Sequence, residues 1–233
     1  MSNEKRKFKD AGYGLLGHIV KALGSAKRLE LLDLLCQAER SVEALAEETQ
    51  MSVANTSRHL QVLQAARLVE AVKQGRFVIY QTSDAAVGEL IRAVRLLAER
   101  RFIGVEQMRQ QFLGGEPDLV AVNRRTLLQR VRQGKVVLID VRPVEEFRTA
   151  HIVGARPMPL LELKRRLSDL PRGKDIVAYC RGPFCVFATE AVRMLRARGR
   201  RAFRLPDSVQ DWRAHRLPVA SGDGNVRKRA KWS

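Results

Sequence analysis

Residues 176–185 read Ile-Val-Ala-Tyr-Cys-Arg-Gly-Pro-Phe-Cys, a stretch that carries both a strand signal and the signal of a reactive site. Four apolar residues before Cys180 are typical of a buried strand, and Gly182-Pro183 is typical of a tight turn. A helical pattern starts near Cys185, so Cys180 is expected in a loop between a strand and a helix N-terminus. Converging backbone N–H groups and the helix dipole at such a place favour a thiolate over a thiol.

Each of the two cysteines of this loop has a functional and a structural interpretation. Cys180 is either a reactive nucleophile, with Arg181 as a nearby cation and Gly182 in the turn, or a buried cysteine that happens to end a strand. The Gly-Pro pair and the second cysteine favour the first interpretation. Cys185 is either a second reactive thiol beside Cys180 or a small residue at a helix start. Our candidate catalytic residues are therefore Cys180, Arg181, Gly182 and Cys185.

Strand-like and helical patterns alternate on both sides of this loop. Such alternation predicts an α/β domain with a parallel sheet. The expected strands are 136–139, 176–179 and 202–205, and the expected helices lie around 126–132, 160–167 and 185–198.

The N-terminal half is nearly all helical in pattern. An apolar helix covers residues 29–36, and Ser41 and Ser52 are placed to cap two short helices, 42–49 and 53–66. Only a tight turn separates these two helices. The pattern predicts a helix-turn-helix.

The second helix of this pair has a face suited to a DNA major groove, or else it is an ordinary solvated helix. Its inner face is expected to contain Val53, Thr56, Leu60 and Leu63. Its outer side offers small and amide-bearing residues and an arginine, which can contact base edges. The candidate DNA-binding residues are Ala54, Asn55, Thr56, Ser57, Arg58, His59 and Gln61 on this helix, with Lys73 and Arg76 beyond it.

Lys73 and Arg76 belong to a predicted hairpin over residues 68–81, in which Gly75 supplies the positive φ of a short turn. This hairpin is the wing of a winged helix. Helices expected around 13–23 and 85–112 have apolar faces that one small domain could hardly cover. We therefore expect a homodimer, whose two-fold symmetry matches a palindromic operator in double-stranded DNA.

Residues 12–112 resemble the ArsR family of bacterial winged-helix repressors. The segments that carry the resemblance are 31–35, 41–46, 55–63 and 75–80. It implies a dimeric DNA-binding regulator that an inducer releases from DNA. Many members sense metals through clustered cysteines or histidines, but Cys36 is the domain's only cysteine and His18 is isolated. Because a soft metal site needs two or three thiolates, we expect no metal site, with Cys36 in the core and His59 used on DNA.

Residues 118–220 resemble a rhodanese domain. The matching segments are 138–143, 145–147, 151–155, 159–160, 179–185, 211–212 and 217–219. The resemblance implies that Cys180 accepts sulfane sulfur as a persulfide. Cys185 is then either a resolving thiol that attacks this persulfide or a small residue at a helix start. The loop closes at Cys185 and lacks the arginine that phosphatases of related folds carry six residues after the cysteine, so it suits sulfur better than phosphate.

Within the same resemblance, Asp140, Arg142 and Glu146 are expected to form an internal ion-pair framework and His151 a structural hydrogen bond. Three glycines of the family pattern are missing. Ala150, the segment 205–208 and Arg216 stand in their place. Their loss is expected to strain positive-φ positions or to change the shape of the loops.

Bulk composition limits the class of protein. The 233 residues carry a net charge of +18, which points to a polyanion such as nucleic acid. Residues 1–113 hold 17 Lys and Arg against 13 Asp and Glu, whereas residues 114–233 hold 26 against 12. Three cysteines are too few for a secreted disulfide framework, and no apolar run reaches membrane-spanning length. The expected location is the cytoplasm, with no membrane partner and no cofactor.

These patterns give one leading hypothesis and two alternatives. The expected layout is a winged-helix domain (12–112), a linker (113–117), a rhodanese-like domain (118–220) and a disordered basic tail (221–233). The leading function is a repressor whose DNA affinity is set by sulfane sulfur from a donor such as thiosulfate or polysulfide at Cys180. The alternatives are a sulfurtransferase enzyme that uses the winged helix for dimerisation or targeting, and a constitutive DNA binder with a passive rhodanese half.

Overall fold

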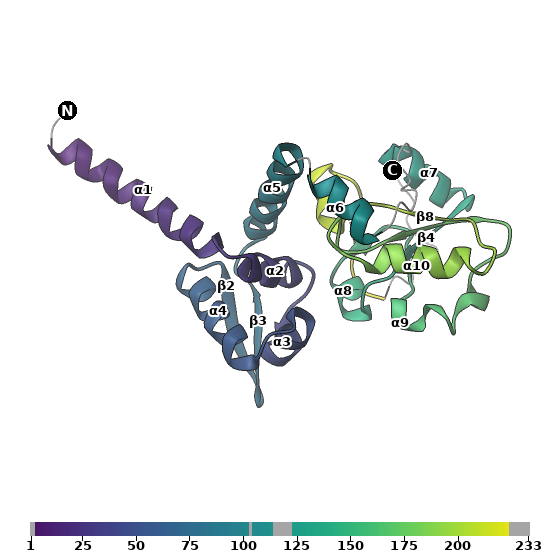
Figure 1. Cartoon of the computed structure of the whole chain (residues 1–233), viewed down its shortest axis with the longest axis horizontal. Helices are drawn as coiled ribbons and strands as arrows, with labels where there is room; N and C mark the ends of the chain where they lie inside the picture. Colours follow the sequence, from purple (N-terminus) through teal and green to yellow (C-terminus); the bar gives the residue numbers. More distant parts are fainter. Residues whose placement is uncertain (1–2, 103, 114–122, 224–233) are drawn as a thin grey trace, which may run out of the picture. The chain divides into compact units, whose positions relative to one another are not determined.

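The computed structural model describes residues 3–102, 104–113 and 123–223. The chain divides into two compact units, residues 1–94 and 95–233 (Figure 1). The division falls within helix α5 (Ala85–Arg101), N-terminal to the linker expected at 113–117. Residues 114–117 of that linker, and the expected tail from residue 224 onward, lie outside the described residues.

The first unit combines helices with a small antiparallel sheet of order β1-β3-β2. Its core gathers leucines from α2, α3 and α4 around Tyr80. This is the winged helix-turn-helix that the sequence predicts. Its elements, besides the start of α5, are α1 (Asn3–Leu23), α2 (Ala26–Leu35), β1 (Arg40–Ser41), α3 (Val42–Thr49), α4 (Val53–Ala65), β2 (Val69–Gln74) and β3 (Phe77–Thr82).

The two predicted serine caps set the helix-turn-helix. The side chain of Ser41 accepts a hydrogen bond from the backbone N–H of Ala44, and Ser52 accepts one from Asn55, each at 3.2 Å. Gln50 ends α3 in the left-handed conformation with a φ of 52°. Only residues 50–52 therefore separate α3 from α4, which confirms the tight turn.

The single helix expected over residues 85–112 is wrong. α5 ends at Arg101, and a separate helix α6 runs over Gly104–Leu113. Glycine costs about 1 kcal/mol in a helix interior compared with alanine, which favours an interruption near Gly104. Neither these helices nor any other in the described part of the chain is long and apolar enough to cross a membrane.

The second unit contains a parallel sheet of order β6-β4-β7-β8 and a two-stranded antiparallel sheet of β5 and β9. The predicted α/β architecture is therefore confirmed. Its elements after α6 are α7 (Arg124–Arg132), β4 (Val136–Asp140), α8 (Val144–Thr149), β5 (His151–Ile152), β6 (Arg156–Pro157), α9 (Leu160–Leu163), a 3₁₀ turn (Leu167–Asp169), β7 (Asp175–Tyr179), α10 (Phe187–Arg196), β8 (Ala202–Arg204), α11 (Val209–Ala214) and β9 (Val219–Ala220).

The two central strands of the parallel sheet, β4 and β7, are buried on both faces, so they read as mainly apolar runs. Alternate residues face opposite layers, because strand side chains alternate in direction. Ile176, Ala178 and Cys180 pack in the core that α9 and α10 cover, whereas Val177 and Tyr179 pack in the core of α7 and α11. Figure 1 shows α10 lying across the sheet. This alternation places the sulfur of Cys180 on the α10 side.

One of the three replaced glycines leaves a strained backbone position. Arg216 follows α11 with a φ of 53°, while its N–H and that of Leu217 bond back to the carbonyls of Arg213 and Trp212. This is the left-handed helix end that glycine favours. Ala150, in contrast, has an extended φ of −166° and carries no such strain.

We expect Arg216→Gly to raise the free energy of unfolding by about 0.5–1 kcal/mol, because the left-handed strain of a side-chain residue exceeds the added chain entropy of glycine. Urea unfolding followed by the fluorescence of buried Trp212 measures the change. The matched control is Arg213→Gly, in the last turn of α11, where the right-handed backbone gives glycine no advantage; this variant should destabilise the unit by about 0.5–1 kcal/mol. Equal destabilisation by both variants would contradict the assignment of strain to Arg216.

Candidate functional site

Helix α4 presents a polar outer face opposite its buried side. Ala54, Asn55, Arg58 and Gln61 are exposed, and Ser57 and His59 are half-buried. Leu60 and Leu63 are fully buried on the other side. An exposed helix face with amide and guanidinium groups has the chemistry to contact base edges and phosphates.

The structure corrects one DNA-binding candidate, which belongs to the inner face of α4, and one residue expected on that inner face. Thr56 is fully buried, and its hydroxyl donates to the carbonyl of Ser52 at 3.0 Å, so Thr56 is not on the outer face. Val53, expected to point inward, is 48% exposed because the first turn of α4 extends past the core. The core contacts of this helix begin at Thr56.

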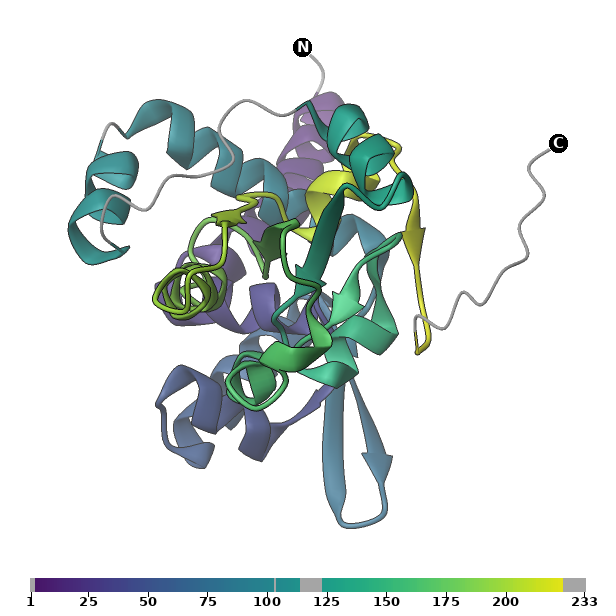
Figure 2. The same ribbon diagram turned by 90° about the vertical axis from the view of Figure 1, so that its right-hand side faces the viewer.

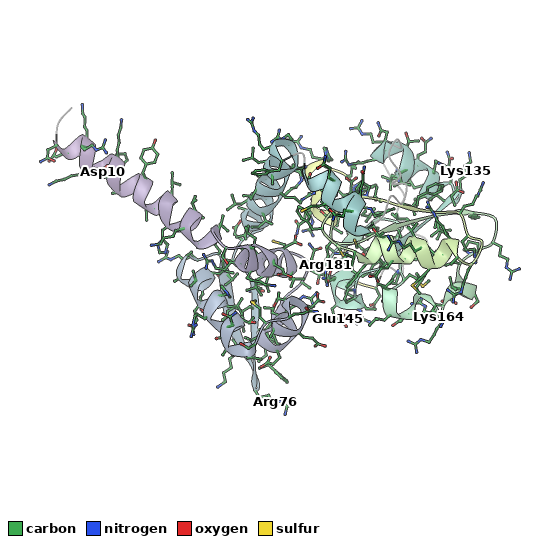
Figure 3. All side chains as sticks on the ribbon, in the orientation of Figure 1. Asp10, Arg76, Lys135, Glu145, Lys164 and Arg181 are labelled. Carbon is green, nitrogen blue, oxygen red and sulfur yellow. The ribbon has the colours of Figure 1, made fainter. Side chains whose placement is uncertain are left out.

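The wing is the hairpin of β2 and β3. Gln74 pairs with Phe77, which leaves Gly75-Arg76 as a two-residue turn with Gly75 at a φ of 60°, as predicted. Figure 2 shows this hairpin extending away from the rest of its unit. Lys73 and Arg76 are exposed, and the guanidinium of Arg76 lies 4.9 Å from the ring centre of Phe77 at the tip (Figure 3). The tip therefore presents cations on a short, defined turn.

In the second unit, Cys180 directly follows β7 and begins the loop that leads to α10. Gly182 lies in this loop with a φ of 124°, a conformation that residues with a side chain rarely adopt. The N–H of Cys185 donates to the carbonyl of Gly182 at 3.2 Å and closes the turn. α10 begins at Phe187, two residues later than expected, so Cys185 lies in the loop before the helix.

Two opposing effects set the charge of Cys180. Its side chain is 1% exposed, and burial alone raises the pKa of a thiol. Hydrogen bonds from the Cys185 side chain and from the backbones of Gly182 and Ala188, together with the positive charge of Arg204, outweigh burial. The net result lowers the pKa of Cys180 from 9.0 to about 7. The thiolate form of Cys180 is therefore reached at a lower pH than that of an ordinary cysteine.

The thiol of Cys185 donates a hydrogen bond to the sulfur of Cys180. The hydrogen bond to Cys180, followed by burial, raises the pKa of Cys185 well above 9.0. Its carbonyl oxygen lies 3.5 Å from the sulfur of Cys180, and both cysteines are free. The pair thus holds one thiolate and one thiol, which leaves either role of Cys185 chemically open.

Arg181 contacts a buried carboxylate. Its Nη2 lies 2.5 Å from Oε1 of Glu146, and its guanidinium lies 5.2 Å from the ring centre of Phe187. Glu146 also lies 3.7 Å from Arg142, whose Nη2 is 2.6 Å from Asp140. The predicted framework of Asp140, Arg142 and Glu146 is confirmed, and Arg181 is part of it.

The remaining histidine and cysteine candidates have local structural partners. Nδ1 of His151 lies 2.8 Å from the carbonyl of Phe147, and the two rings stack with centres 3.8 Å apart. Burial, followed by the charge of Asp33, raises the pKa of Cys36 to about 12, which leaves it a neutral thiol. No three His, Cys, Asp or Glu side chains within the described ranges are grouped to hold a metal ion.

Arg204 is a charged residue near the thiol that the sequence-based prediction missed. It ends β8 and is only 1% exposed. The signal that could have found it is an arginine inside the expected strand 202–205, where every other residue is apolar.

Comparison with known proteins accounts for both units. Residues 25–71 match the family described as bacterial regulatory protein, arsR family, and residues 123–215 match the rhodanese-like domain. The HTH-type transcriptional regulator Rv0324 of Mycobacterium tuberculosis is 42% identical over 207 residues, which are 89% of this chain and 91% of that protein. The chain belongs to the ArsR family of bacterial regulatory proteins. This ArsR-family member is a transcriptional regulator that combines a winged helix-turn-helix with a rhodanese-like domain.

Two further matches each cover less than half of this chain. A sulfurtransferase of Allochromatium vinosum is 28% identical over 44% of this regulator and 96% of its own length. The homodimeric winged helix-turn-helix DNA-binding domain Mb0332 of Mycobacterium bovis, solved by NMR, is 34% identical, with a TM-score of 0.39 over 44% of this chain and 91% of that one.

Proposed function

We propose that this regulator is a homodimeric repressor whose affinity for its operator is controlled by sulfane sulfur bound to Cys180. The observation that carries the proposal is the buried, partly ionised thiol of Cys180 on the same chain as an ArsR-type helix-turn-helix. A thiolate that is ionised near neutral pH is the form that attacks sulfur electrophiles. The exposed polar face of α4 and the basic wing supply the DNA-binding surface.

The chemistry at Cys180 needs no added oxidant. The thiolate attacks the outer sulfur of thiosulfate, the S–S bond of the donor breaks, and sulfite leaves with its electron pair. With a polysulfide anion, the leaving group is the polysulfide shortened by one sulfur. The product in both cases is a persulfide on Cys180, whose terminal sulfur is an anion that backbone N–H groups of the loop can stabilise.

The added sulfur changes a loop with little free space. The sulfur of Cys180 lies 3.5 Å from the carbonyl oxygen of Cys185 and 3.8 Å from that of Gly182. A further sulfur atom with a full charge must displace part of this loop, because packed interiors have few voids. A coupling free energy of about 1–3 kcal/mol between this change and DNA binding corresponds to a roughly 5- to 150-fold change in DNA affinity.

Exposed apolar side chains of α1 support the homodimer. Apolar residues of this size, repeated along one helix, are typical of a surface that a partner covers. Two-fold symmetry would then present two α4 helices to two half-sites. The exposed residues are Phe8, Tyr13, Leu15, Leu16 and Val20.

A gel shift on the DNA upstream of the regulator's own gene tests the proposal. Polysulfide is expected to weaken binding at least fivefold, while mass spectrometry of the same sample locates an added mass of about 32 Da on Cys180. Dithiothreitol should restore binding. Unchanged affinity at full modification of Cys180 would overturn the proposal.

A second candidate function is sulfur transfer to a partner. The low pKa of Cys180, and the similarity of the second unit to a sulfurtransferase over almost the whole length of that protein, favour it. Steady-state transfer from thiosulfate to cyanide separates the two functions. Rapid turnover with no effect of the donor on DNA binding supports the enzyme, whereas a stable adduct without turnover supports the regulator.

A further inference from the structure

The last residue of β8 is a buried arginine in an apolar strand. Arg204 follows Ala202 and Phe203, precedes Leu205, and is 1% exposed. Removing a guanidinium from water has a large desolvation cost, which an anion nearby must offset. The burial of Arg204 therefore indicates that it stabilises a negative charge inside the second unit.

The strand register places Arg204 on the same side of the sheet as the reactive sulfur. β8 pairs with β7 in parallel, and Arg204 lies beside Ala178. Side chains two residues apart share a face, so Arg204 shares the face of Ala202, and Cys180 shares that of Ala178. Ala178, Cys180 and Ala202 all pack in the core under α10. The guanidinium thus lies one strand away from Cys180, on the same face.

The chain on the C-terminal side of Arg204 is fixed against β7 and the thiol loop. The N–H of Leu205 donates to the carbonyl of Ala178 at 2.8 Å. Further along, Ser208 lies so close to the loop that a Cβ on Gly182 would be 3.6 Å from the Cβ of Ser208. Such anchoring holds Arg204 in place relative to Cys180 and limits its movement away from the sulfur.

Among the described residues, the groups that lower the pKa of Cys180 are neutral donors and one cation. The neutral donors are the Cys185 thiol and the backbones of Gly182 and Ala188, and the charge of Arg204 acts with them to lower the pKa of Cys180. Arg181, although next in sequence, directs its guanidinium to Glu146. Figure 3 shows Arg181 at the other end of this unit from Lys135, which precedes β4 at the amino edge of the sheet.

We propose that Arg204 is a positioning residue whose charge, together with the hydrogen bonds of the loop, helps to keep the sulfur of Cys180 anionic, first as thiolate and then as persulfide. The persulfide part of this inference rests on the proposed function, whereas the thiolate part does not. Arg204 would thereby select a product whose terminal sulfur is charged. The same charge disfavours protonation of the persulfide, the step that would make its sulfur a weaker nucleophile.

The test is the pH profile of alkylation of Cys180 in the full chain by neutral iodoacetamide, read by mass spectrometry of the peptide that contains Cys180. Removing the charge in Arg204→Met or Arg204→Gln is expected to move the midpoint upward from about 7 by about one pH unit. Arg204→Lys should keep a midpoint near that of the wild type. The matched control is Arg213→Met, which removes an exposed charge from α11 on the other side of the sheet.

A midpoint that stays near 7 in a folded Arg204→Gln variant would overturn the inference, as would an equal shift in Arg213→Met. Thermal unfolding identifies the variants that fold. Two neutral replacements, Arg204→Met and Arg204→Gln, are made in case one of them does not fold. The profile is recorded without DNA or sulfur donor. A shifted midpoint therefore supports the role of Arg204 whatever the DNA-binding experiment shows. DNA binding that polysulfide leaves unchanged overturns only the proposed function.

Discussion

Replacing Cys180 with serine is expected to abolish the release of the regulator from DNA by polysulfide. The serine hydroxyl has nearly the shape of the thiol but does not ionise near neutral pH, so it cannot attack a sulfane sulfur. The fivefold or greater loss of DNA affinity expected for the wild type should therefore disappear. Binding without polysulfide should stay within about twofold, because the substitution leaves the DNA-binding unit unchanged. Fluorescence anisotropy of a labelled operator duplex measures both quantities.

Cys36→Ala is the matched control for this experiment. Cys36 lies in the first unit, and burial followed by Asp33 raises the pKa of its thiol to about 12. This variant should respond to polysulfide as the wild type does. Polysulfide release that persists in Cys180→Ser and disappears in Cys36→Ala would contradict the assignment of the switch to the second unit.

Replacing Arg58 with alanine is expected to reduce operator affinity by a large factor. Arg58 is exposed on the outer face of α4, where an arginine can make bidentate contacts to guanine. Each such contact provides about 1–3 kcal/mol, and a dimer makes it at two half-sites. The expected loss is therefore about 2–6 kcal/mol, at least roughly 30-fold in affinity. Titration of the operator at fixed salt measures this loss.

Gln64→Ala is the matched control, since Gln64 is exposed near the C-terminal end of α4, beyond the last candidate DNA-binding residue of that helix. It should change affinity by less than twofold. The salt dependence adds a second readout. Loss of a phosphate contact lowers the slope of log affinity against log salt by about 0.9, whereas loss of a base contact lowers affinity and leaves the slope unchanged. An affinity of Arg58→Ala equal to that of the wild type would remove α4 as the reading helix.

Local signals in the sequence were sufficient to predict most secondary-structure elements. Ser41 and Ser52 cap helices because their side chains reach the first free N–H groups of the helix. This local contact does not depend on what the helix packs against. Gly75 forms the wing turn because its φ of 60° is costly for other residues. The buried strand before Cys180 follows from its run of apolar residues. Helix ends were less certain, as the interruption between α5 and α6 shows.

The contacts of the charged side chains required the tertiary structure. Arg181 is adjacent to Cys180 in sequence, yet its guanidinium binds Glu146. Val53 is expected on the inner face of α4 from its helical spacing, yet it is 48% exposed. In each case the surroundings of the side chain depend on another element or on how the helix packs. The local spacing of residues does not encode these surroundings.

The sequence by itself determined the two folds and the position of the reactive cysteine, because backbone preferences and strand or helix periodicity act over a few neighbouring residues. Only the tertiary structure decided which cation stabilises that cysteine. Arg204 lies beside Ala178 through the pairing of two strands that α10 separates along the chain. Strand register, burial and electrostatics act through space, and they gave the thiol its charge.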